Sequence, residues 1–172
     1  MDIRNALKEQ YHAGLEMLAD CVRKCPDDLW TAGAYPRYTW RIAFHTAFFT
    51  NVYLVQNESA YQPWPDRTKD VYEEMWANPG DVEPYELPDT APVASRDEIL
   101  RFIEFIDSIV DSVVDGLDLD TEDSGVSWYG PFGKLSHEMM TIGHINYHVG
   151  QLSELLMARG IDIEWVAKKD RH

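Results

Sequence analysis

One segment decides the fold of this chain: Gly143-His144-Ile145-Asn146-Tyr147-His148-Val149-Gly150-Gln151. It lies inside a strong helical pattern that runs from about residue 134 to 159, with Gly160 well placed to end the helix. Its two histidines are four residues apart, which puts them about 40° apart on one face, at the edge of the apolar side. Both imidazoles can therefore bind one ion.

Three further amphipathic patterns accompany this helix. Apolar residues at helical spacing predict a first helix over residues 2–24 and a second over 36–57, where Pro36 suits a first turn. A third begins at the capping box Ser95-Arg96-Asp97-Glu98 and ends near Gly116. No segment alternates convincingly as a strand. The sequence therefore predicts an all-α protein, a four-helix bundle that forms a single domain over residues 1–172.

Two connections between the predicted helices are long. Residues 58–94 contain six prolines among many acidic and aromatic residues. A connection of this length in a compact domain is usually functional, so a lid-like insert is expected, with a short helix over 69–76. Residues 120–134 form a loop rich in glycine, serine and aromatic residues. The first connection allows a helix order other than simple up-down-up-down.

The composition restricts the classes of partner. Lys and Arg number 15 against 30 Asp and Glu, a formal charge of −15 over 172 residues. Without a basic patch, such a chain is not expected to bind nucleic acid or anionic membranes. No apolar run approaches membrane-spanning length and no signal peptide is visible, so a cytoplasmic protein is predicted. Cys21 and Cys25 are expected to pack on one helix face.

A third histidine, His45, shares the apolar face of the second predicted helix. Together with His144 and His148 it would provide three imidazoles from two helices and leave open positions on a metal ion. The alternative is a set of core histidines that hydrogen-bond to backbone or hydroxyl groups, as most single buried histidines do. A pair on one face plus a third on an adjacent apolar helix favours a metal site.

The other histidines do not fit this site. His137 is seven residues before His144, about 10 Å along the helix axis, which is too far to share an ion with both partners. We interpret it as a helix-start or pocket-rim residue with a modest chance of a supporting role. The pattern Glu9-x-x-His12 is half of a di-iron motif, but the last helix has no matching Glu-x-x-His. His12 and His172 are therefore expected to have no metal role.

The pattern His144-x-x-x-His148-x-Gly-Gln151, with His45 upstream, resembles the DinB-like superfamily. The resemblance covers the helix order, the long link between helices 2 and 3, and the Gly-rich loop before helix 4. It implies a four-helix bundle with one metal-binding histidine on helix 2 and two on helix 4. The chain departs from the family at Val149, where members often carry a second histidine or an arginine. The family includes transferases that use low-molecular-weight bacterial thiols, and homodimers are common in it.

These observations lead to two hypotheses of different classes. The first is a metal-dependent hydrolase or thiol transferase for a small molecule, with zinc or nickel at the site and manganese or iron as alternatives. The second is a non-catalytic bundle that binds metal or a small ligand as a dimeric sensor or stress protein. Arg41 is either an anion clamp for a substrate carboxylate or a solvated charge, and Gln151 either hydrogen-bonds near the site or faces a neighbouring helix. Four aromatics either wall a pocket or only pack: Tyr61, Trp64, Trp128 and Tyr129.

Overall fold

The computed structural model describes residues 2–66, 86–129 and 132–169. Within these ranges every regular element is helical and no strand occurs, which confirms the predicted all-α class. The short helix predicted over 69–76 lies outside the described residues. The elements are the long helices α1 (Ile3–Lys24), α3 (Thr39–Tyr53), α5 (Arg96–Gly116) and α6 (Lys134–Met157), the short helix α2 (Asp27–Trp30), and the 3-10 turns η1 (Glu58–Ala60) and η2 (Ser127–Tyr129). None of the described helices combines the length and the apolar character needed to cross a membrane.

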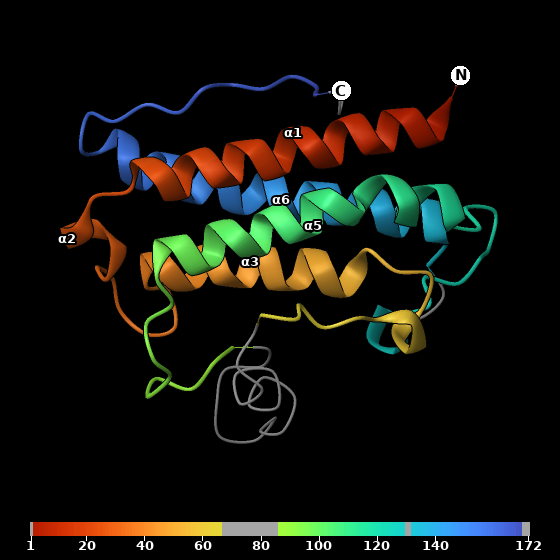
Figure 1. Ribbon diagram of the computed structural model, residues 1–172, viewed down its shortest axis with the longest axis horizontal. Helices are drawn as coiled ribbons and strands as arrows, with labels where there is room; N and C mark the ends of the chain where they lie inside the picture. Colours follow the sequence, from red (N-terminus) through yellow and green to blue (C-terminus); the bar gives the residue numbers. More distant parts are fainter. Residues whose placement is uncertain (1, 67–85, 130–131, 170–172) are drawn as a thin grey trace.

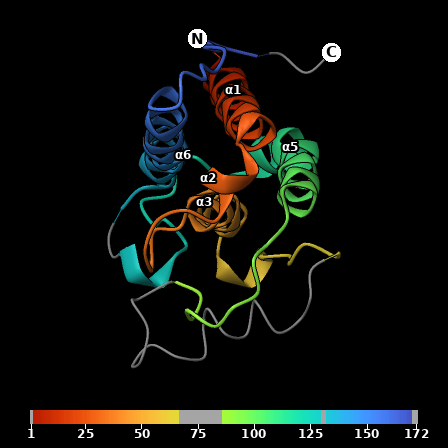
Figure 2. The same ribbon diagram turned by 90° about the vertical axis from the view of Figure 1, so that its left-hand side faces the viewer.

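The long helices lie side by side along the long direction of the molecule (Figure 1). Helices α1 and α6 run one way, and α3 and α5 run the other way (Figure 1). Helix α1 packs mainly on α5 and α6, and α3 packs on the same two helices, as the end view in Figure 2 also shows. Because α3 and α5 are consecutive and parallel, the chain between them must return along their length. This explains why that connection is long.

The core confirms the spacing read from the sequence. In α1 the apolar positions from Leu7 to Val22 are buried, while Ile3 at the helix start is 38% exposed. In α3 every residue except His45 is buried. Cys21 packs on the buried side of α1 as predicted, whereas Cys25 lies just past the end of the helix. Both are buried free thiols, and burial raises their pKa values to about 12 and about 11. Neither sulfur is therefore a ready nucleophile at neutral pH.

The predicted start of the second helix was wrong. Pro36 belongs to a turn, not to the first turn of the helix, and α3 begins only after the extended Tyr38 (φ −62°, ψ 146°). The turn is tight because Gly33 has φ 116°, and a Cβ there would lie 2.7 Å from the carbonyl oxygen of Arg37. The amide of Arg37 closes the turn by donating to Ala34 O at 2.7 Å. The helix also ends earlier than predicted, at Tyr53 and not at residue 57.

The other helix ends follow local signals. Ser95 accepts a hydrogen bond from the amide of Glu98 at 3.1 Å, so the predicted cap of α5 is confirmed. Helix α6 ends at Met157, two residues earlier than predicted, and the chain reverses at Gly160 with φ 73°. The short helix α2, which follows Pro26, was not predicted from the sequence. Proline followed by two acids is also a signal for a helix start.

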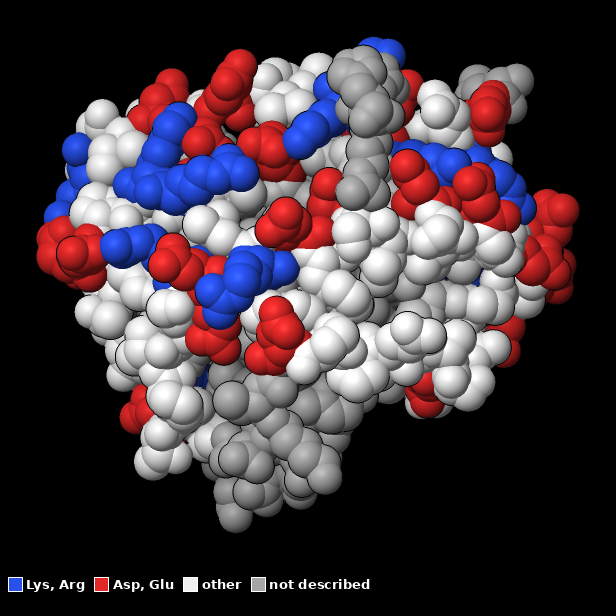
Figure 3. Space-filling view, viewed as in Figure 1, with Lys and Arg blue, Asp and Glu red and all other residues white. Residues whose placement is uncertain are grey.

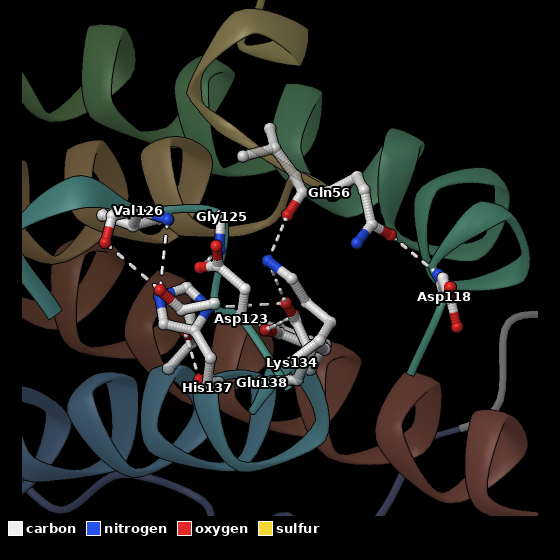
Figure 4. A network of polar contacts seen from close by, with 12 residues as sticks. Gln56, Asp118, Asp123, Gly125, Val126, Lys134, His137 and Glu138 are labelled. Carbon is white, nitrogen blue, oxygen red and sulfur yellow. Dashed lines mark hydrogen bonds and ion pairs between the residues drawn. The ribbon is translucent and has the colours of Figure 1, made fainter. Parts of the chain in front are cut away.

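A loop contact fixes the start of α6. Gly125 has φ 76°, and a Cβ there would lie only 2.1 Å from the carbonyl oxygen of Gln56, so the two loops approach as closely as backbone allows. The side chain of Gln56 also accepts from the amide of Asp118 at 2.7 Å (Figure 4). Lys134, the first residue of α6, donates to Val55 O at 2.8 Å. The end of α3 and the start of α6 are thus held together.

Candidate metal site

The three predicted ligands come together where α3 packs on α6. His45 lies on α3, and His144 and His148 lie one turn apart on α6. The Nε2 atom of His144 is 3.3 Å from Nε2 of His45 and 3.1 Å from Nε2 of His148. One ligand atom from each ring lies within 4.8 Å of the others, and among the described residues these form the one such group of three or more. The three histidines are therefore placed so that they could hold one ion.

The spacing of the ring nitrogens fits a tetrahedral ion. Two nitrogens that each stand 2.0–2.1 Å from such an ion are about 3.3–3.4 Å apart. The observed separations of 3.1 and 3.3 Å are close to that value. Three protein ligands would fill three positions and leave a fourth for solvent or substrate. A closed site would need a fourth histidine, cysteine or carboxylate, and the described residues place none with this group.

Gln151 fixes the orientation of one ring. Its Oε1 atom is 2.7 Å from Nδ1 of His148. A carbonyl oxygen can only accept, so Nδ1 carries the proton and Nε2 keeps its lone pair for the site. The sequence left two roles for Gln151, a hydrogen bond near the site or a contact with a neighbouring helix. The observed geometry matches the hydrogen bond.

Glu86 is the site residue that sequence reasoning missed. Its Oε1 atom lies 3.2 Å from Nδ1 of His45, which is an ion-pair distance, although the two atoms do not form a hydrogen bond. The same oxygen accepts from Arg37, and the carboxylate is buried. Burial alone would raise the pKa of Glu86, but the contacts with His45 and Arg37 outweigh it and the pKa is lowered. A carboxylate behind a ligating histidine is a common supporting arrangement, because it sets which ring nitrogen faces the metal.

The triad is electrostatically suited to a cation. Burial, together with the nearby His148 and His45, lowers the pKa of His144 to about 3. Burial likewise lowers the pKa of His148 to about 4, with added effects from His45 and Arg37. Both rings are therefore neutral near pH 7 and offer lone pairs. The Nδ1 atoms of His144 and His45 are buried without a hydrogen-bond partner, whereas Nδ1 of His148 faces Gln151.

Arg41 is not the solvated charge that one interpretation expected. The side chain is buried, and its two terminal nitrogens donate to the carbonyl oxygens of Leu87 and Pro88. Its guanidinium also lies over the ring of Trp40, 4.9 Å from the centroid. These donors are directed at backbone, so Arg41 holds the segment that carries Glu86 against α3. The anion clamp proposed for it has no exposed group to act with.

His137 lies in the first turn of α6, as one interpretation expected, but not at a pocket rim. Its ring is fully buried, 5.4 Å from the ring of Tyr53, and neither ring nitrogen has a hydrogen-bond partner. Nδ1 lies 3.6 Å from Oε1 of Glu138, which is also 3.8 Å from Nζ of Lys134 (Figure 4). The other carboxylate oxygen accepts from the hydroxyl of Tyr11 at 2.6 Å. His137 thus belongs to a buried polar cluster beside the triad and does not join it.

The four aromatic residues divide into two groups. Trp64 stacks on Phe102 with centroids 4.9 Å apart and is buried, and Tyr61 packs against the core. Tyr129 donates from its hydroxyl to that of Tyr53, whose ring is 6.1 Å from His144. Tyr53, which was not predicted, and Phe49 thus wall the triad directly, with Tyr129 and Trp128 packed behind Tyr53.

Charged residues line the groove between α1 and α5, on another side of the molecule. The face in Figure 3 carries basic and acidic side chains mixed together. Arg23 and Arg101 line this groove with acids that include Glu104 and Asp107. Among the described residues, this groove brings together no set of metal ligands. We therefore place the candidate chemistry at the triad and not in this groove.

His12 is buried between two aspartates of α5 and has no part in the triad. Its Nδ1 is 2.6 Å from Asp107 Oδ1, and its Nε2 is 3.2 Å from Asp111 Oδ1. The hydrogen bond to Asp107 raises the pKa of His12, and burial opposes it without cancelling it. His172 lies outside the described residues.

The stability of the protein should depend on pH through His12. A histidine whose pKa is raised by folding stabilises the folded state fully below its unfolded value of about 6.5, and this contribution is lost as pH rises through the folded value. We expect His12→Gln to lower the free energy of unfolding more at about pH 6 than at about pH 9, measured by urea denaturation. An equal loss at both pH values would contradict this role.

The resemblance to the DinB-like superfamily rests on the histidine spacing, the helix order and the connections. Comparison of the chain with protein-family models, with curated proteins and with solved structures gave no match. The function must therefore be argued from the residues of the site.

Proposed function

We propose that the protein is a divalent-metal-dependent enzyme of the DinB-like four-helix-bundle type, acting on a small molecule by hydrolysis or thiol transfer. The observation that carries the proposal is the convergence of three Nε2 atoms at 3.1 and 3.3 Å from two packed helices. An ion at this point would accept the lone pairs of all three rings at once, which hydrogen bonds between the facing ring nitrogens cannot do.

The residues around the triad support this reading. Gln151 hydrogen-bonds to the outer nitrogen of His148 and Glu86 lies beside the outer nitrogen of His45, so the inner nitrogens are available for the ion. Phe49 and Tyr53 exclude water from one side of His144. When bound, a divalent ion with three neutral ligands would keep its full charge and lower the pKa of a water molecule or thiol that reaches it.

The ligand set favours zinc or nickel. Three imidazoles suit zinc, nickel, copper and iron, whereas manganese and magnesium prefer oxygen ligands. No carboxylate lies among the converging atoms of the described residues. We therefore rank manganese below zinc and nickel at this site and keep iron as an alternative.

The alternative function is a non-catalytic bundle that works as a dimer, and one observation favours a dimer. The outward side of α6 carries the exposed apolar residues Met139, Tyr147 and Met157, with open space above Gly143 and Gly150. A second copy could approach closely there. A homodimer is compatible with either function. The two functions must therefore be distinguished by whether the metal ion has an open coordination position.

The coordination of the metal tests the proposal. Elemental analysis of untagged protein is expected to find about one equivalent of zinc or nickel per chain. After exchange for cobalt(II), the visible spectrum should show a tetrahedral site, and added azide should change it by entering the open position. A spectrum that azide leaves unchanged would favour the non-catalytic bundle. A protein that binds no metal would contradict the metal-dependent enzyme and would favour a non-catalytic bundle that binds a small ligand.

A further inference from the structure

Arg37 is an exposed cation beside the triad, and no function described above uses it. It lies in the turn before α3. The backbone carbonyl of Arg37 comes so close to Gly33 that a Cβ there would lie 2.7 Å from its oxygen. Its side chain is 57% exposed, although one terminal nitrogen pairs with Oε1 of Glu86. Arginine has five N–H donors in a planar fork, so a single carboxylate oxygen does not use them all.

The position of this guanidinium is fixed relative to the triad. The Glu86 oxygen that accepts from Arg37 also lies 3.2 Å from Nδ1 of His45. Because both nitrogens contact one oxygen, they lie within about 6 Å of each other. The positive charge of Arg37 also reaches His148, where it adds to the effects of burial and His45 on the pKa of that ring. The side chain is thus close to two of the three candidate ligands.

Arg41 provides a comparison four residues further along the chain, inside α3. Its terminal nitrogens are buried and donate to backbone oxygens of residues 87 and 88. Arg41 thus fixes the position of residues 86–88 relative to α3, and Glu86 in this segment forms the ion pair with Arg37. Two arginines four residues apart therefore have different tasks: the buried one builds the support and the exposed one faces solvent beside the site.

We propose that Arg37 forms an anion subsite beside the histidine triad, which binds the carboxylate of a ligand whose other end reaches the triad. This rests on the proposed function and names a substrate class for it: small acids with a metal-binding group, such as a thiol, a few bonds from the carboxylate. The formal charge of the chain is −15, so an anion needs a local cation to approach. A guanidinium binds a carboxylate through two parallel N–H donors.

Two thiols that differ in one group test the subsite. Cobalt(II)-loaded protein is titrated with 3-mercaptopropionate and with the neutral 3-mercaptopropanol, and the sulfur-to-cobalt charge-transfer band reports binding. Replacing Arg37 with glutamine is expected to weaken binding of the acid about ten-fold and to leave the alcohol within about two-fold. Arg37→Lys should restore part of the loss, because it keeps the charge and loses the fork.

The control is Arg23→Gln, which removes an exposed cation of α1 in the groove against α5. It should leave the preference for the acid unchanged. The subsite is overturned if cobalt binds but Arg37→Gln leaves the ratio of the two affinities unchanged, or if neither thiol alters the cobalt spectrum. Absence of the cobalt d–d bands is a different result, which overturns the metal site itself and the subsite with it.

Discussion

Alanine in place of His144 is expected to lower the affinity of the protein for zinc by about 100- to 1000-fold. A four-ligand zinc site binds with about 10–16 kcal/mol, so each ligand contributes roughly 2.5–4 kcal/mol. Nε2 of His144 lies close to the corresponding atoms of both other histidines, so its loss removes the centre of the site. Competition with a chelating dye at fixed pH measures the affinity, and the triple alanine variant of His45, His144 and His148 should bind no zinc at all.

A smaller effect is expected from Gln151, which contacts a ligand and not the ion. Leucine at this position removes the acceptor for Nδ1 of His148 and should weaken zinc binding about 10- to 100-fold. Gln151→Glu keeps an acceptor and should retain most of the affinity. Asn146→Ala changes an exposed polar residue of the same helix and should have no effect. Full zinc occupancy in the triple alanine variant would refute the assignment, and unchanged affinity in Gln151→Leu would refute the role of Gln151.

The helical part of the site could be predicted because a helix fixes its own geometry. A spacing of four residues places His144 and His148 on one side whatever the tertiary structure, and the apolar stripe says that this side faces inward. His45 needed one further assumption, that α3 packs on α6, and a bundle with few helices makes that arrangement probable. The residue types were informative because imidazole is uncommon in an apolar stripe.

The supporting part of the site could not be predicted, because it depends on loops. Glu86 reaches His45 only after the connection beyond α3 has returned along the helices, and nothing distinguishes it from the other acids of that segment. The roles of Arg41 and Arg37 were hidden for the same reason. Both arginines lie near the start of α3. The position of residues 87 and 88 determines that Arg41 is buried and Arg37 is exposed.

His137 shows the limit of a helical wheel. The wheel places it on the same side as His144, which is correct, but it gives no information on what covers that side two turns earlier. There the loop held by Gly125 closes over the end of α3, so a position expected at a rim is fully buried. Lys134 is buried for the same reason, although lysine at a helix start is normally solvated.

Replacing Lys134 with methionine is expected to lower the free energy of unfolding by about 3–5 kcal/mol. Methionine keeps the length and apolar stem but removes the ammonium group, leaving the fully buried carboxylate of Glu138 without a cation. The carbonyl oxygen of Val55 also loses its donor. Urea denaturation followed by circular dichroism measures the loss, and Lys24→Met is the matched control. Lys24 pairs with Asp20 at the same spacing of four on the surface, so its loss should cost no more than about 1 kcal/mol.

A double-mutant cycle separates the ion pair from the packing of the lysine stem. Glu138→Gln preserves the shape of the side chain and an oxygen to accept from the hydroxyl of Tyr11, while it removes the negative charge. With the charge gone, the methionine no longer strands a buried carboxylate, so the double variant Lys134→Met, Glu138→Gln should lose less stability than the two single changes added together. Exact additivity would mean that the two charges do not interact. The cost of Lys134→Met would then come from the lost bond to Val55 and from packing alone.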